Sequence, residues 1–374
     1  MKRVVLSFGT RPEAIKVAPV FLALKKMKGI EPIVLLTGQH REQLEQALSL
    51  FDIRGSSNLD VMTDRQTLPE LAGLLIPKIA KKLKEYQADY VLVQGDTLTT
   101  FAVAWAAFLE KIPVGYIEAG LRSHLLYEPF PEEANRCLTS VLSEIDFAPT
   151  SLAKQNLIRE GKNPENILIT GQTGIDAILY ASQKQALPES FPEGPLVTVT
   201  MHRRENWPIL KDLAKVLARI AKEFPKYNFI YPVHLNPIVR EAVTPPLKDI
   251  PNFQLTDPLD YGTMAALLTK SELIITDSGG LQEEGAALHI PVAILRNVTE
   301  RPEGLSAGIL KLAGTDPEKV YKNIHSLLIN EEERYRMKQA KNPYGDGKAS
   351  VRIAEAVGWK LGLTEFKPED WLEN

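Results

Sequence analysis

The chain is predicted to fold as an α/β protein with two doubly wound domains, each built on a mostly parallel sheet. Two observations lead to this prediction. Short apolar runs alternate with helix-length segments along the whole sequence, and the runs are apolar enough to be buried on both faces of a sheet. At 374 residues the chain is also long enough to form two hydrophobic cores.

The expected elements follow one another in a regular alternation. The strands expected in the first half are RVVLSF, PIVLL, YVLVQ, VGYI and IDFAP, and those in the second half are ILIT, LVTVT, FIYPV, FQLT, LIIT and VAIL. Helical patterns such as REQLEQALSLF and LKDLAKVLARIAKEF lie between them. The turn-rich stretches KNPEN, GQTG and LPESFPEG place a domain boundary between residues 165 and 195. We expect domains over 1–170 and 171–361, and a final segment, 362–374, that packs back on the first.

Composition narrows the classes of function. The net charge of −3 argues against a surface for nucleic acid or anionic membranes. A single cysteine, Cys137, excludes intramolecular disulfides and cysteine-rich metal sites, and it fits a reducing cytosol as a partly buried, inert thiol. The N-terminal apolar run is too short for a signal sequence, and no run approaches 18 apolar residues. A cytoplasmic protein is therefore expected.

The first strand leads into the unusual turn SFGTRPEAIKVAP. A dinucleotide-binding turn carries three glycines that let backbone touch a pyrophosphate, whereas here only Gly9 is free of a side chain. Pro12 suits the first turn of a helix, and Lys16 follows one turn later. Arg11 and Lys16 are therefore expected to meet an anion that arrives from outside this turn.

Carboxylates follow the next buried strands. Asp96 comes after YVLVQ, Glu118 comes after VGYI, and Glu132 and Glu133 lie in PFPEEANR. A carboxylate after a buried strand is costly unless it has a partner or a task, so three of these acids are interpreted as acid–base groups facing the anion. Asp96 has an alternative interpretation as the N-cap of the following helix. Glu133 is interpreted as a solvated or structural neighbour.

The run LIITDSGGLQEEGAAL predicts an anion site in the second half. Ser278, Gly279 and Gly280 would present backbone N–H groups at a helix N-terminus, although a plain tight turn is the alternative. Glu283 and Glu284 are expected in the first helical turn, where one of them is available to a ribose diol. Arg301, in TERPEG, follows the next strand.

Two histidines also follow strands. His202 comes after LVTVT and precedes Arg203 and Arg204, and His234 comes after FIYPV. Structural and functional roles for them are about equally favoured. No HExxH or similar spacing indicates a metal site.

Six ordered motifs resemble one family over nearly the whole chain. GTRPEAIKVAP, GDTLTT, EAGLRS, PFPEEANR, HRREN and TDSGGLQEE followed by TERPEG are similar to the non-hydrolysing UDP-N-acetylglucosamine 2-epimerases. The resemblance implies two Rossmann-like domains in a glycosyltransferase-B-like arrangement with the active site in the cleft. It also implies a homodimer that interconverts UDP-GlcNAc and UDP-ManNAc without metal or nicotinamide and supplies ManNAc units for cell-surface polysaccharide.

The resemblance implies roles for individual residues. The implied catalytic residues are Lys16, Asp96, Glu118, Glu132 and His202. The implied UDP-sugar ligands are Arg11, Lys16, His202, Ser278, Gly279, Gly280, Glu284 and Arg301, with the segment from Leu259 to Met264 near the uracil. Some bacterial members bind a second, activating UDP-GlcNAc, and the matching positions are Gln39, Gln43, Arg65, Glu132, Arg203 and His234. Glu42 departs from that pattern, because those members carry glutamine there.

The implied reaction is elimination of UDP to 2-acetamidoglucal followed by re-addition with a proton on the other face of C2. Three alternatives remain open. A hydrolysing epimerase would release ManNAc and UDP, a glycosyltransferase of the same fold would need an acceptor surface, and a nucleotide-sugar-binding regulator would have no use for three carboxylates.

Overall fold

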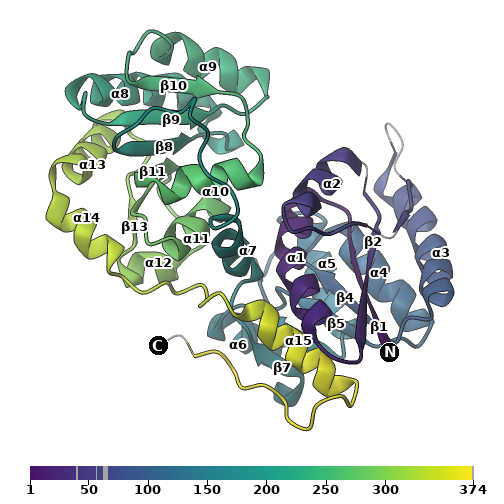
Figure 1. Cartoon of the computed structure of the whole chain (residues 1–374). Coiled ribbons are helices and arrows are strands. Elements are labelled where there is room, and N and C mark those ends of the chain that lie inside the picture. The colour runs from purple at the N-terminus through teal and green to yellow at the C-terminus, as the bar shows by residue number, and fades with distance from the viewer. Residues whose placement is uncertain (39–40, 56, 62–65, 373–374) are drawn as a thin grey trace. The chain divides into compact units, whose positions relative to one another are not determined.

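A computed structural model describes the chain except residues 39–40, 56, 62–65 and 373–374 and the side chains of residues 41–43. The chain divides into two compact units (Figure 1). The first unit comprises residues 1–177 and 345–374, and the second comprises residues 178–344. Within the described residues, none of the helices combines the length and apolar character that a membrane span requires.

The first unit is built on a seven-stranded sheet in the order β3-β2-β1-β4-β5-β6-β7. All of its strand pairs are parallel. The strands are β1 (Lys2–Phe8), β2 (Ile30–Leu36), β3 (Ser57–Asn58), β4 (Tyr90–Gln94), β5 (Val114–Ile117), β6 (Ile145–Ala148) and β7 (Ile167–Ile169). Strands β4, β5 and β6 are buried along their whole length, as expected for parallel strands covered by helices on both faces.

The helices of this unit are α1 (Arg11–Lys26), α2 (Arg41–Ser49), α3 (Leu68–Tyr86), α4 (Leu98–Leu109), α5 (Glu132–Leu142), α6 (Ser151–Arg159) and, from the end of the chain, α15 (Ala349–Lys360). Helix α7 (Thr173–Ala181) contains the boundary between the two units, which falls after Ala177. Helix α15 lies against α1 (Figure 1). Beyond it, Trp371 N–H donates to the Ile169 carbonyl and Asp370 accepts from Ile169 N–H, so the C-terminal segment lies along edge strand β7.

The second unit repeats this construction with a six-stranded parallel sheet in the order β10-β9-β8-β11-β12-β13. The strands are β8 (Leu196–Thr200), β9 (Asn228–Pro232), β10 (Phe253–Thr256), β11 (Ser271–Thr276), β12 (Val292–Ile294) and β13 (Leu310–Leu312). The helices are α8 (Leu210–Glu223), α9 (Pro237–Leu247), α10 (Tyr261–Thr269), α11 (Gly279–Ala287), α12 (Pro302–Ala307), α13 (Pro317–Ile329) and α14 (Glu331–Lys338), and short 3₁₀ helices cover Pro164–Asn166 in the first unit and Arg204–Ile209 here.

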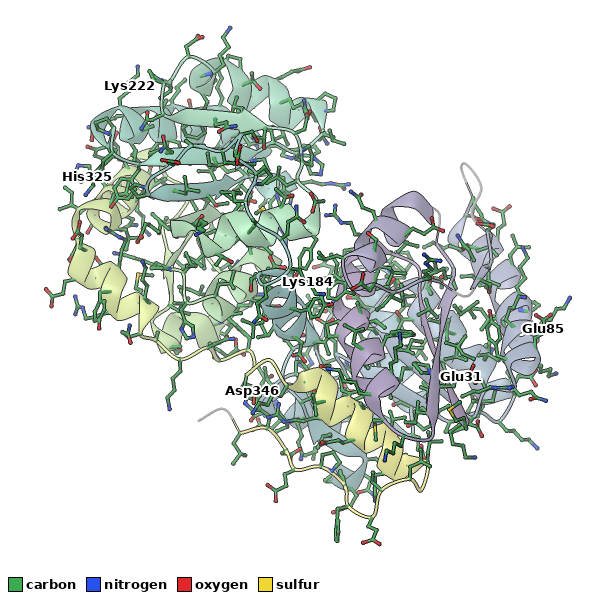
Figure 2. All side chains as sticks on the ribbon, viewed as in Figure 1. Glu31, Glu85, Lys184, Lys222, His325 and Asp346 are labelled. Atoms are coloured by element: carbon green, nitrogen blue, oxygen red, sulfur yellow. The ribbon has the colours of Figure 1, made fainter. Side chains whose placement is uncertain are left out.

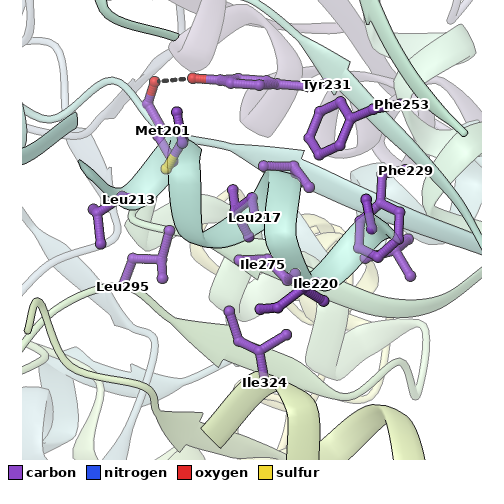
Figure 3. Packing of buried hydrophobic residues seen from close by; sticks show 14 of the residues in the cluster. Met201, Leu213, Leu217, Ile220, Phe229, Tyr231, Phe253, Ile275, Leu295 and Ile324 are labelled. Carbon is purple, nitrogen blue, oxygen red and sulfur yellow. Dashed lines mark hydrogen bonds between the residues drawn. The ribbon is translucent and has the colours of Figure 1, made fainter. Parts of the chain in front are cut away.

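The core of the second unit shows how the helical pattern produces packing (Figure 3). Leu213, Leu217 and Ile220 recur at helical spacing on α8 and are fully buried. They pack with strand residues such as Phe229 and Ile275 in one cluster. Charged side chains such as Glu85 and Lys222 point into solvent from the helices (Figure 2).

The strand orders define where each unit can hold a ligand. In the first sheet the chain passes from β1 to β2 in one direction and from β4 to β5 in the opposite direction. In the second sheet it passes in the same way from β8 to β9 and from β11 to β12. Ligands of doubly wound folds bind beyond the carboxyl ends of strands at such switch points. The residues after β1, β4, β8 and β11 are therefore the ones to examine.

The predicted fold class is confirmed, and every expected strand is present. The short strands β3 and β13 were missed, because two or three residues give too weak a pattern. The run ILIT was grouped with the second half, but as β7 it forms the edge of the first sheet. This run lies near the predicted domain boundary, so its position in the sequence does not show which sheet it joins. Its pairing with β6 assigns it to the first sheet.

Candidate active site

The turn after β1 is held by a buried carboxylate. Thr10 is the N-cap of α1, and Glu13 accepts hydrogen bonds from the backbone N–H groups of Gly9 and Thr10 at 2.9 and 2.8 Å. Its other oxygen accepts from the hydroxyl of Thr97, at the start of α4, at 2.6 Å. Burial raises the pKa of Glu13, against these hydrogen bonds. Glu13 thus joins the turn that carries Arg11 to the turn that carries Asp96.

Lys16 and Glu118 meet past the ends of β1 and β5. The Lys16 Nζ lies 2.7 Å from both carboxylate oxygens of Glu118, and Gln94 Nε2 donates to the same carboxylate. Glu118 has a φ of 67°, a left-handed conformation that costs a non-glycine residue free energy and is concentrated at functional sites. The Glu118 side chain is 12% exposed and that of Lys16 is 27% exposed, so a ligand can reach this pair.

Asp96 does not cap helix α4. Thr97 is the N-cap, and its hydroxyl accepts from the backbone N–H of Thr100. The alternative interpretation of Asp96 as a cap is therefore wrong, because the helix begins one residue later than that interpretation requires. Arg136 Nη2 lies 2.5 Å from Asp96 Oδ2, and the Asp96 side chain remains 32% exposed.

The two acids at the start of α5 differ in their partners. Glu132 Oε2 is buried and has no hydrogen-bond partner among the described residues. Glu133 is buried and accepts from Arg136 and from the backbone N–H groups of Ser123 and His124. Burial alone would raise the pKa of Glu133, but these hydrogen bonds outweigh it and lower the pKa. Glu133 is thus a structural and not a solvated neighbour. Cys137, in the same helix, is partly buried, and burial raises the pKa of its thiol.

In the second unit, buried Asp277 organises the turn after β8. Its carboxylate accepts from the backbone N–H groups of His202 and Arg203 and from Asn206 Nδ2, at 3.0–3.1 Å. The His202 Nδ1 lies 3.5 Å from Asp277 Oδ1, and the His202 ring stacks on that of His234 with centroids 5.6 Å apart. Burial lowers the pKa of His202, which favours the neutral imidazole.

The turn after β11 leads directly into helix α11. Ser278 is the N-cap of α11, which begins at Gly279, and Gly280 is exposed with open space around the position of a Cβ. A Cβ at Gly279 would lie 2.7 Å from Arg301 Nη1, so only glycine lets that guanidinium approach the helix start. The backbone N–H groups and dipole of a helix N-terminus favour a phosphate here.

The acids of α11 lie one turn later than expected. Because the helix begins at Gly279, Glu283 and Glu284 fall in its second turn and not its first. Glu283 is buried and pairs with Arg301 Nε at 2.7 Å. Glu284 accepts from the hydroxyl of Tyr261 at 3.2 Å. Dipole stabilisation therefore explains neither acid, and each is explained by a specific partner.

The remaining predicted residues are distributed as follows. Leu259 and Met264 pack at the start of α10 against a small apolar cluster. Gln43 lies in α2, but its side chain, like Gln39 and Arg65, is outside the described residues. In the described part of the chain, no group of three or more histidine, cysteine or acidic residues is placed to hold a metal ion.

Sequence reasoning missed Arg136 and Asp277 as partners of site residues. Both lay in motifs that had been singled out, PFPEEANR and TDSGG. For Asp277 a signal was present, because an acid directly after a buried strand needs a partner. Arg136 gave no such signal, since its partner Asp96 is 40 residues away.

Comparisons with known proteins show the family to which the chain belongs. The family model described as UDP-N-acetylglucosamine 2-epimerase matches residues 22–358. The UDP-N-acetylglucosamine 2-epimerase of Bacillus subtilis is 43% identical over 373 residues, covering 99% of this chain and 98% of the relative. The crystal structure of UDP-GlcNAc 2-epimerase from Neisseria meningitidis bound to UDP-GlcNAc is 42% identical, with a TM-score of 0.86 over 95% of this chain and 99% of that one. The S. aureus MnaA–UDP co-structure is 41% identical, with a TM-score of 0.86 over the whole of both chains. The chain belongs to the UDP-N-acetylglucosamine 2-epimerase family.

Proposed function

We propose that this protein reversibly converts UDP-GlcNAc into UDP-ManNAc without releasing free sugar. The observation that carries the proposal is the placement of the Lys16–Glu118 pair and of Asp96 beyond the neighbouring strands β1, β4 and β5 of one sheet. This group lies at the switch point of its sheet, in a chain whose Neisseria relative was solved with UDP-GlcNAc.

The chemistry explains why several charged groups are needed. The C2 proton of the sugar is not next to a carbonyl, so a side chain cannot remove it directly. When the bond from C1 to the diphosphate oxygen begins to break, positive charge grows on C1 and the ring oxygen, as in glycoside cleavage. A base then takes the C2 proton, the C–H electrons form the C1–C2 double bond, and UDP leaves with the C1–O pair. Re-addition of UDP to C1, with a proton delivered to the opposite face of C2, gives the epimer.

We assign the proton transfers to the first unit. Asp96, Glu118 and Glu132 are the acid–base groups, and Lys16 meets the negative charge on the departing diphosphate with Arg11. The buried Glu132 oxygen, which has no hydrogen-bond partner in the described part of the chain, supports this assignment, because such atoms are rare unless a ligand completes them. These carboxylates all lie in the domain that the sequence predicts over residues 1–170.

We assign UDP binding to the second unit, within residues 171–361. Ser278, Gly279 and Gly280 offer backbone N–H groups to the diphosphate, and Arg301 adds a charge-assisted contact. Glu284 is the acceptor for the ribose, His202 contacts the UDP-sugar, and the segment from Leu259 to Met264 lies near the uracil. The position of Arg301 over Gly279 supports this arrangement, since it brings the cation to the helix N-terminus.

We further propose an activating site for a second UDP-GlcNAc that involves Gln39, Gln43, Arg65, Arg203 and His234 together with Glu132. If the second UDP-GlcNAc binds the active conformation of the enzyme more tightly, it shifts the protein toward that conformation. Velocity against UDP-GlcNAc is then sigmoidal, and UDP-ManNAc alone reacts slowly until UDP-GlcNAc is added. Hyperbolic kinetics, with UDP-ManNAc reacting at full rate unaided, would exclude the site.

We also propose that the protein works as a cytoplasmic homodimer that supplies ManNAc units for cell-surface polysaccharide. The surface of α4 and α5 supports dimerisation. Helix α4 has no charged residue, and Phe108 and Leu109 at its end are half exposed. Leu138 and Val141 of α5, which packs on α4, are also exposed. An apolar surface of this kind is typical of an interface.

The decisive experiment is an NMR time course of UDP-GlcNAc alone in deuterated water. We expect a mixture with UDP-ManNAc, with deuterium entering at C2 and no metal or nicotinamide added. Free ManNAc accumulating in step with UDP would assign the hydrolysing reaction instead, and transfer of GlcNAc to an added acceptor would assign a glycosyltransferase.

A further inference from the structure

Helix α5 holds Asp96 through two neighbouring side chains. Arg136 Nη2 lies 2.5 Å from Asp96 Oδ2, and Asn135 Nδ2 donates to the Asp96 backbone carbonyl at 2.9 Å. Asn135 is buried, and the Arg136 side chain is 17% exposed. One helix therefore fixes both the backbone and the carboxylate of the turn that follows β4.

Glu133 in turn fixes the orientation of Arg136. Its Oε2 accepts from Arg136 Nη1 at 2.9 Å, and its Oε1 accepts from the backbone N–H groups of Ser123 and His124 at 3.0 Å. Glu133 is buried, so this anchor does not move freely in solvent. Because a guanidinium is a planar fork, holding one Nη on Glu133 determines where the other Nη points. It points at Asp96.

The position of the Arg136–Asp96 ion pair indicates a role beyond stabilisation of the fold. An ion pair that is partly exposed contributes little to folding, and a buried one is often no better than apolar packing. Here the arginine occupies one carboxylate oxygen, while the Asp96 side chain stays 32% exposed past β4, at the switch point of the sheet. A carboxylate that must face a reacting atom gains from having its rotation fixed in this way.

We infer that Arg136 is a positioning residue for the reaction, acting through Asp96, with Glu133 as its anchor. The inference rests on the proposed function, because it assigns Arg136 to the orientation of a group that this function uses. Arg136 makes no contact with substrate in this role. Its loss lets the Asp96 carboxylate rotate away from the position from which it exchanges a proton.

The test compares two arginine variants in the same unit. Arg352 is a matched control, because it forms a bidentate pair with Asp346 at 2.7 Å and the two side chains are 18% and 35% exposed, against 17% and 32% for Arg136 and Asp96. We expect Arg136→Ala to lower kcat by about 10²-fold, with KM changed by less than about threefold. We expect Arg352→Ala to leave kcat within about twofold of the wild-type value. Equal losses in the two variants would overturn the inference.

Two further measurements separate positioning from a merely structural role. Guanidinium ion, added below the concentrations that unfold the protein, is expected to restore activity to Arg136→Ala and not to Asp96→Asn. In an Asp96→Asn background, Arg136→Ala should lower kcat by no more than about twofold, because both changes remove one function. Absence of rescue together with additive losses would contradict the inference.

The outcomes are also distinguishable from a failure of the proposed function. The identity of the product formed by the wild-type protein tests the proposed function. The ratio of kcat between Arg136→Ala and Arg352→Ala tests the role of Arg136, and it is measured through UDP release or proton exchange at C2. If Arg136→Ala does not fold, Arg136→Lys replaces it. A lysine keeps the charge but cannot bridge both carboxylates, so we expect an intermediate loss of kcat that guanidinium does not restore. Full activity in Arg136→Lys would overturn the inference.

Discussion

The two units share the same strand order over six strands but present different chemistry at their switch points. Beyond β1, β4 and β5 the first unit presents charged side chains, namely Lys16, Asp96 and Glu118. Beyond β11 the second unit presents a helix start at which Gly279 is buried beside Arg301 and Gly280 is exposed. Side chains can change protonation state, whereas backbone amides bind an anion without titrating. This difference supports the proposed division, in which one unit transfers protons and the other binds the nucleotide.

The largest expected effect is on turnover in the first unit. Glu118→Gln should lower kcat by about 10²–10⁴-fold while the affinity for UDP stays close to that of the wild type, because an acid–base group is lost and the second unit is unchanged. Steady-state kinetics and calorimetric titration with UDP measure the two quantities. If UDP affinity fell as far as turnover, Glu118 would be a structural residue and the division between the units would fail.

The second prediction concerns the response of each unit to pH. Burial raises the pKa of Asp146 in the first unit to about 6, against the nearby cation of Lys162 at 3.0 Å. The folded unit therefore binds this proton more tightly than the unfolded chain, and its free energy of unfolding falls as the pH rises from about 4 to about 6. A shift of about two pKa units corresponds to about 3 kcal/mol. In the second unit the hydrogen bond from Arg296 lowers the pKa of Glu300, which has the opposite consequence: stability is lost as the pH falls.

Asp146→Asn should remove this pH dependence from the first unit. Hydrogen exchange of peptides from β5 and β6, followed between pH 4 and pH 7 and corrected for intrinsic exchange rates, reports the local stability. Peptides from β8 and β11 serve as the internal control. An unchanged pH dependence in the variant would mean that Asp146 does not titrate as described.

The third prediction tests the backbone anion site. Gly280→Ala should weaken UDP binding by about tenfold or more, since a Cβ would project into the space that the diphosphate approaches. The unliganded protein should not be destabilised, because the space around that Cβ is open and alanine favours a helix. Gly73→Ala in α3 is the matched control, because its Cβ also meets nothing within 4 Å. Equal UDP affinity in both variants would count against the second unit as the nucleotide site.

The smallest expected effect is at the surface of α4 and α5. Val141 is 79% exposed on α5, and Val141→Lys should raise the dissociation constant of the proposed dimer by about tenfold through burial of a charge. Light scattering over a dilution series measures it. Val351→Lys on α15, at a side chain 46% exposed, is the control that should leave the dissociation constant unchanged. A dimer that persists unaltered in Val141→Lys would place the contact elsewhere.

The sequence by itself determined which segments are buried strands and which residues follow them. Apolar runs between helical patterns predicted nearly every strand. The ends of these strands were enough to place Asp96, Glu118, His202 and Ser278 just after a strand. These are local properties, since burial of a strand requires apolar residues wherever it lies in the sheet. The roles of the site residues remain proposals.

Tertiary structure decided what depends on pairing between distant segments. Strand order placed the switch points and assigned β7 to the first sheet. Tertiary packing brought α15 against α1, gave Asp96 the partner Arg136, 40 residues away, and gave His202 the partner Asp277, 75 residues away. Helix α4 begins one residue later than a cap at Asp96 would require, so Thr97 is the cap and the Asp96 side chain is not used for capping. Such contacts depend on three-dimensional packing, and no local pattern in the chain identifies which distant residue the partner is.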